Sequence, residues 1–193
     1  KDWHITIEDD GLVDLILKTN RLGAKDADLF MYISEAGNEV DLKAEHINQY
    51  IRDSSGMGFT AKNFRTWAAT SRCAERLAFL SSKRTAAEMK KWLKSIPSVE
   101  SMDKLWSEGD WDVPTTDTGR NKAMLAVIDT VAANLGNTRT VCRSSYIHPW
   151  FLDAWAEGRL GEAWAEFEDM RAMGNMTPGE STTLRILKSV IKG

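Results

Sequence analysis

The segment Leu135–Pro149 reads LGNTRTVCRSSYIHP, and it predicts a corner between two helices. Gly136 is typical of the residue that ends a helix, because glycine adopts left-handed backbone angles without steric cost. We expect a short helix over 137–145 and another helix that begins at Pro149, since proline is favoured in the first helical turn. Asn137 and Tyr146 would then lie at the two ends of one short helix.

A second segment, Phe59–Trp67, reads FTAKNFRTW and opens a long helix predicted over 60–82, with Thr60 as its cap. Helical periodicity places an apolar set inward: Phe64, Trp67, Ala68 and Ser71. It places a basic stripe on another face: Lys62, Arg65, Arg72 and Arg76. Arg65 lies between two aromatic residues, and a guanidinium held in this way is oriented to grip a phosphate with two bonds. A solvated helix face is the alternative interpretation, above all for Arg72 and Arg76.

The rest of the chain is predicted to be mainly α. Helical patterns cover 10–17, 41–53, 85–95, 99–107, 118–134, 149–155, 164–167 and 178–191. In the helix over 41–53, an inner side is expected at Leu42, His46, Ile47, Tyr50 and Ile51. Short strands are expected only near the N-terminus, over 3–7 and 28–33, where apolar residues alternate or cluster.

Composition limits the classes of protein that the chain can belong to. It has 193 residues, a net charge of −3 and 42% hydrophobic residues, which is typical of a globular domain and argues against a wholly basic nucleic-acid binder. No segment is long and apolar enough to cross a membrane, and no signal peptide is recognised, so we expect a cytoplasmic protein. Cys73 and Cys142 are expected to be reduced thiols, and the scattered histidines predict no metal site.

Tyr146 has two interpretations. From spacing alone, a tyrosine packed in the core of a helical corner is the more frequent outcome. A catalytic tyrosine is the alternative, and it needs cations or hydrogen-bond donors nearby because an unperturbed phenol has a pKa of about 10. Arg139 and Arg143 are close in sequence, and folding could bring Arg65 to the same place.

The two quoted segments resemble the signature segments of bacterial and poxvirus-like type IB DNA topoisomerases. Weaker similarity covers 29–53 and 119–138. The resemblance implies the catalytic fold that these enzymes share with tyrosine recombinases. It also implies relaxation of supercoiled DNA without ATP, metal or cofactor, through transient cleavage of one strand and a 3′-phosphotyrosyl intermediate.

The resemblance assigns roles to individual residues. Tyr146 matches the nucleophile, Arg65 matches an arginine that stabilises the transition state, and Asn137 matches a donor to a non-bridging phosphate oxygen. The expected DNA-binding residues are Lys62, Arg72, Arg76, Arg139 and Arg143. The expected partners are double-stranded DNA and an N-terminal clamp domain of the same protein, which we expect to be a monomer.

The chain also departs from the family pattern. The family uses a further arginine and a lysine general acid that precede both segments, so we expect residues 1–193 to be a catalytic domain without its start and without the clamp domain. A helical insertion is expected near 83–118, where Trp92, Trp106 and Trp111 predict a small core more readily than a partner surface. A tyrosine recombinase remains an alternative, although those enzymes carry a His-x-x-Arg box where this chain has Phe64–Trp67. A helical DNA- or protein-binding module without catalysis is the second alternative.

Overall fold

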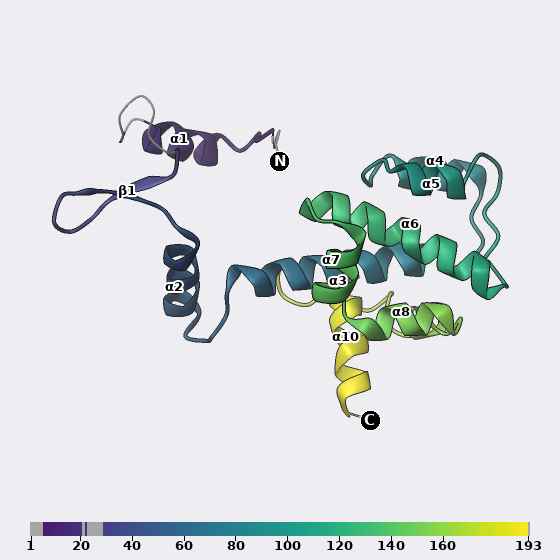
Figure 1. Ribbon diagram of the computed structural model, residues 1–193. Helices are drawn as coiled ribbons and strands as arrows, with labels where there is room; N and C mark the ends of the chain where they lie inside the picture. The colour runs from purple at the N-terminus through teal and green to yellow at the C-terminus, as the bar shows by residue number, and fades with distance from the viewer. Residues whose placement is uncertain (1–5, 21, 23–28, 193) are drawn as a thin grey trace. The chain divides into compact units, whose positions relative to one another are not determined.

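The computed structural model describes residues 6–20, 22 and 29–192, and the mainly α fold predicted from the sequence is confirmed (Figure 1). The strand expected over 3–7 lies mostly outside the described residues, and Thr6 and Ile7 have no regular structure. The chain divides into two compact units, residues 1–61 and 62–193. No helix within the described residues is long and apolar enough to span a bilayer.

The described part of the first unit contains two helices and a hairpin. Helix α1 (Asp10–Thr19) is capped by the side chain of Asp9, which accepts from the Leu12 N–H. Strands β1 (Met31–Ile33) and β2 (Glu39–Asp41) pair antiparallel, and β1 lies within the range predicted for a strand. Helix α2 (Ala44–Ser55) therefore begins three residues later than predicted, because the residues before it form β2. It ends at Gly56, whose φ is 64°.

The inner side predicted for the helix at 41–53 is not buried. Neither α1 nor α2 has a buried residue, and Leu42, Ile47 and Tyr50 are exposed. This expectation is wrong for the unit as described, because a hairpin and two short helices provide too little apolar surface to cover one another.

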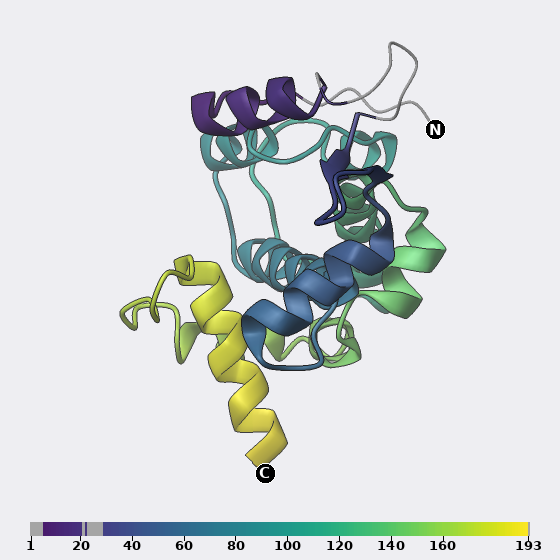
Figure 2. The same ribbon diagram turned by 90° about the vertical axis from the view of Figure 1, so that its left-hand side faces the viewer.

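The second unit contains the remaining helices. They are α3 (Ala61–Leu80), α4 (Ala86–Leu93), α5 (Glu100–Leu105), α6 (Asp117–Leu135), α7 (Arg139–Ser145), α8 (Pro149–Ala156), α9 (Leu160–Ala165) and α10 (Pro178–Lys192). Helices α3 and α6 supply most of the buried core. Helices α4 and α5 lie at one end of this unit, and the C-terminus of α10 lies at the opposite end in both views (Figure 1, Figure 2).

The segment 83–118, predicted to be a helical insertion, is part of the core of this unit. Its two predicted helices form as α4 and α5, separated near Pro97. Trp111 is buried and donates its indole N–H to the Leu80 carbonyl at 2.9 Å. Trp92 stacks on Phe79 with the ring centres 4.7 Å apart. Trp106 also packs against the main core, so the interpretation of these tryptophans as core residues is confirmed.

The last helix buries small polar residues beside its apolar ones. Leu187 packs against the core and Ile191 is exposed, and the fully buried residues are Ser181, Thr182, Thr183 and Ile186. The hydroxyl of Thr183 donates to the Gly179 carbonyl at 2.8 Å, and the hydroxyl of Thr182 donates to the Phe167 carbonyl at 3.4 Å. Small polar residues can therefore be buried here, which an apolar periodicity does not reveal.

Candidate active site

Asn137 lies in a tight link between α6 and α7. Gly136 ends α6 with φ 65°, and the Asn137 N–H closes the turn on the Ala132 carbonyl at 2.9 Å. The Thr138 hydroxyl then caps α7 by accepting from the Val141 N–H. Within the described residues, the side-chain nitrogen of Asn137 is buried and has no hydrogen-bond acceptor. Buried donors are nearly always satisfied in folded proteins, so this amide is a candidate for binding a ligand.

Tyr146 lies in the link between α7 and α8. Its N–H donates to the Cys142 carbonyl at 3.1 Å, and its half-buried ring packs against the core. The link ends at Pro149, and His148 before it has the extended backbone that proline imposes on the preceding residue. The hydroxyl of Thr70, on α3, bonds to the backbone of Tyr146 and His148. The backbone around Tyr146 is therefore attached directly to α3.

Arg65 connects the two sequence segments. Its guanidinium carbon lies 5.2 Å from the centre of the Tyr146 ring, and its Nη2 donates to the Leu135 carbonyl at 3.0 Å. A cation over the face of a tyrosine is attracted by the ring's negative face. The structure thus brings Arg65 into contact with Tyr146 and ties it to the end of α6, two residues before Asn137.

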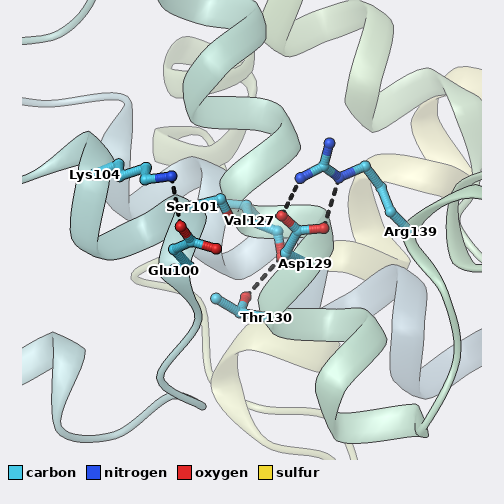
Figure 3. A network of polar contacts seen from close by, with 7 residues as sticks. All are labelled: Glu100, Ser101, Lys104, Val127, Asp129, Thr130 and Arg139. Carbon is cyan, nitrogen blue, oxygen red and sulfur yellow. Dashed lines mark hydrogen bonds and ion pairs between the residues drawn. The ribbon is translucent and has the colours of Figure 1, made fainter.

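Arg139 is held by an acidic residue of α6 (Figure 3). Its Nε donates to Asp129 Oδ1 at 2.6 Å, and its Nη2 donates to Asp129 Oδ2. The hydroxyl of Ser101, on α5, donates to the same carboxylate at 2.5 Å. Partial burial is the largest single influence and raises the pKa of Asp129, but the bonds from Arg139 and Ser101 and the charge of Arg139 together hold this pKa below its usual value.

The other residues expected to bind DNA fall into two groups. Lys62, Arg72 and Arg143 are exposed. Arg143 and Arg139 both line an open cavity of about 540 Å³ between α6, α7 and α8. Arg76 is only 8% exposed, so the prediction that it belongs to an exposed basic stripe is wrong.

The burial of Arg76 has a clear physical cause. Helix α6 packs over this side of α3, and Arg76 donates to the Thr130 hydroxyl at 2.8 Å and to Asn134 Oδ1 at 2.7 Å. Burial lowers the pKa of Arg76 to about 10. Phe64 was predicted to face inward but is exposed. The buried face of α3 is instead centred on residues such as Ala69, Cys73 and Leu77.

The two cysteines are buried free thiols, as the sequence predicted. Burial raises the pKa of Cys73 far above its ordinary value and raises that of Cys142 to about 11. Both thiols are therefore protonated near neutral pH and unreactive. Among the residues that the structure describes, no group of His, Cys, Asp and Glu side chains could hold a metal ion.

Sequence reasoning missed two residues that shape this site. Thr70 gave no signal, because a threonine inside a long helix is common and its bonds reach residues 146 and 148. Asp129 was also missed, although the spacing from Asp129 to Arg139 across a predicted helix end could have suggested a pair.

Comparison with known proteins finds a family model that matches the chain. The model of a family described as "Eukaryotic DNA topoisomerase I, catalytic core" matches residues 13–154, well over half of the chain. The matched range includes both segments that meet at Arg65 and Tyr146, and it includes residues 83–118 between them. A search of curated proteins finds no match.

Proposed function

The chain belongs to the type IB DNA topoisomerase family, and we propose that it relaxes DNA by cleaving and resealing one strand through Tyr146. The family makes the chain a DNA-acting isomerase. The assignment of individual residues, the likeness to the bacterial and poxvirus-like branch and the monomeric state are parts of the proposal.

The proposed reaction conserves the number of phosphodiester bonds. The phenolic oxygen of Tyr146 attacks a backbone phosphorus, a bond forms between them, and the bond from phosphorus to the 5′-oxygen breaks. The phenol loses its proton and the departing 5′-oxygen gains one. The cut strand rotates about the intact one, and the 5′-hydroxyl then attacks the phosphotyrosine to reverse the step. Because the covalent link keeps the energy of the original bond, the reaction needs no nucleotide.

The contact between Arg65 and Tyr146 is the observation that carries this proposal. A phosphate that meets the Tyr146 oxygen would approach the guanidinium at the same ring. A guanidinium has five N–H donors, and the Leu135 carbonyl accepts from one of the nitrogens, Nη2. Donors therefore remain for the oxygens of a phosphate whose charge grows in the transition state.

Asn137, in the same sequence segment as Tyr146, supports the same proposal. Its buried side-chain nitrogen has no acceptor within the described residues, and a non-bridging phosphate oxygen would supply one. Such a donor is fixed before the reaction begins, so it stabilises developing charge without reorganisation. The further arginine and the lysine general acid that the resemblance implies are not assigned to any described residue.

DNA binding itself is proposed to use cations around this site. Lys62, Arg72 and Arg143 are exposed, and Arg139 is partly exposed. These residues would contact the phosphates of double-stranded DNA. The proposed catalytic domain includes the insertion at 83–118, because its tryptophans share the core of α3 and α6.

The test is capture of a covalent adduct. The substrate is a duplex of randomised sequence in which sulfur replaces the 5′-bridging oxygen at one step. A thiol leaves more readily than an alcohol and needs no proton donor, so the assay does not depend on the general acid. The 193-residue chain should form an adduct that survives denaturant and gel electrophoresis.

Substitutions decide whether Tyr146 makes the bond. Tyr146→Phe should abolish the adduct and leave non-covalent DNA binding nearly intact, since only the attacking oxygen is removed. Tyr50→Phe is the matched control, because Tyr50 is exposed in the first unit. Asn137→Ala should slow adduct formation on the order of 10²-fold, as removal of one transition-state donor does. A persistent adduct in Tyr146→Phe would refute the assignment.

A further inference from the structure

Thr70 makes two bonds to the link that carries Tyr146. Its hydroxyl donates to the Tyr146 carbonyl at 3.0 Å and accepts from the His148 N–H at 3.1 Å. Thr70 is 3% exposed, so water does not compete freely for either bond. One buried side chain thus satisfies a backbone acceptor and a backbone donor on either side of Ile147.

Helix α3 therefore holds Tyr146 at two points. Thr70 binds its backbone, and Arg65, one and a half turns earlier on the same helix, lies over its ring. Helix α3 is rigid here because its buried face is packed into the core. The position of the Tyr146 ring relative to Arg65 is then set within one element, since both contacts originate from it.

We propose that Thr70 is a positioning residue for the cleavage step. The proposal rests on the proposed role of Tyr146. Thr70 does not touch the reacting atoms; it fixes the backbone from which the nucleophile projects. Without its hydroxyl, the Tyr146 carbonyl and the His148 N–H would lack their observed bonds in a partly buried place, and the link would shift to find others. A displacement of about 1 Å in a reacting group costs on the order of 10²-fold in rate.

The first experiment compares substitutions at neighbouring buried hydroxyls. Thr70→Val keeps the shape and removes the hydroxyl, and Thr70→Ser keeps the hydroxyl and removes a methyl group. Ser71→Ala is the matched control, because Ser71 is buried on the same helix but bonds only to the α3 carbonyls of Trp67 and Ala68. Each variant is assayed for the single-turnover rate of adduct formation on the sulfur-bridged duplex and for its non-covalent Kd.

The expected pattern separates positioning from general stability. Thr70→Val should lose about 10²-fold in adduct rate with a Kd within about threefold of the parent. Thr70→Ser and Ser71→Ala should remain close to the parent in both. If Thr70→Val does not fold, Thr70→Cys replaces it, and its weaker donor should still cost about tenfold or more. A parental rate in Thr70→Val, or an equal loss in Ser71→Ala, would overturn the proposal.

A second readout does not need catalysis. The chain has three tyrosines, so labelling with 3-fluorotyrosine gives three ¹⁹F signals, and Tyr146→Phe identifies the one from Tyr146. Thr70→Val should shift or broaden that signal and leave those of Tyr32 and Tyr50 unchanged, whereas Thr70→Ser should leave all three. An unchanged Tyr146 signal in Thr70→Val would overturn the proposal. Failure of the parent chain to form any adduct would instead refute the proposed function, while this signal still reports whether Thr70 fixes Tyr146.

Discussion

Replacing Asp129 by Asn should weaken the fold slightly and strengthen DNA binding. In the structure, the Asp129 carboxylate accepts two bonds from Arg139 and one from Ser101. An asparagine keeps the shape of the side chain but removes its negative charge and one of its two acceptor oxygens, so the bidentate pair with the guanidinium is broken.

The size of the stability loss follows from exposure. Arg139 is 44% exposed, so solvent screens much of its attraction to Asp129. We therefore expect the free energy of unfolding to fall by about 1 kcal/mol, near the upper end for exposed pairs because the geometry is bidentate. The gain in DNA affinity comes from Arg139, whose guanidinium no longer pairs with a carboxylate. If Arg139 then contacts a phosphate, the plot of log K against log salt should steepen by about 0.9.

Two measurements check this prediction. Urea unfolding gives the stability, and fluorescence anisotropy of a labelled duplex, titrated with salt, gives the slope. Glu100→Gln is the matched control, because Glu100 pairs with Lys104 on α5 and its substitution removes the same charge away from Arg139. A slope in Asp129→Asn no steeper than in Glu100→Gln would mean that Arg139 does not reach a phosphate, and the reasoning would be refuted.

The difference in free energy of unfolding between the parent and Asp129→Asn should also depend on pH. The pKa of Asp129 is lower in the folded chain than in the unfolded chain, so the folded state binds fewer protons at this site. The contribution of the Asp129 carboxylate to the free energy of unfolding is complete above the unfolded pKa of about 3.9. It is lost as the pH falls through the lower pKa of the folded chain. Asp129→Asn and the parent should therefore differ at pH 6 and converge in acid.

Four further substitutions test the rest of the fold and of the DNA contact. Arg76→Ala removes the buried guanidinium that donates to the fully buried Thr130 hydroxyl and should cost about 2–4 kcal/mol in urea unfolding. Arg72→Ala, exposed on the same helix, should change stability by less than about 0.5 kcal/mol and instead reduce the salt slope of DNA binding by about 0.9. Gly136→Ala forces a side chain into the left-handed region and should lower stability by about 1–2 kcal/mol. Trp111→Ala should cost about 3–5 kcal/mol if the insertion shares the main core, and a loss below about 1 kcal/mol would contradict this.

The helices of the second unit could be predicted because their ends carry strong local signals. Gly136 ends α6, Pro149 begins α8 and Pro178 begins α10, as expected from the conformations that glycine and proline favour. The exact ends were harder to predict: the helix expected over 118–134 begins at Asp117, after a cap at Thr116. Neighbouring residues with similar side chains can each cap a helix, so the choice depends on the preceding chain.

Burial was harder to predict than secondary structure, because it depends on which helix packs where. Arg72 and Arg76 lie four residues apart on α3, yet one is exposed and the other is covered by α6. No local pattern distinguishes them. The contact of Arg65 with Tyr146 was expected only through the family resemblance, and Thr70 was not expected at all, since its bonds join residues far apart in sequence.

The site is organised by the C-terminal part of α6. Between Asp129 and Leu135 this helix accepts hydrogen bonds from three arginines: Arg76 and Arg65 of α3, and Arg139 of α7. The C-terminal end of a helix carries partial negative charge, which favours cations there. Arg76 is buried and can only hold α3 in place. Under the proposed function, Arg139 would exchange its carboxylate partner for a phosphate oxygen, and Arg65 would use the donors that the Leu135 carbonyl leaves open. Arg76 would keep α3 and α6 together through Thr130 and Asn134. DNA binding of this kind would leave the alignment of Arg65 with Tyr146 unchanged.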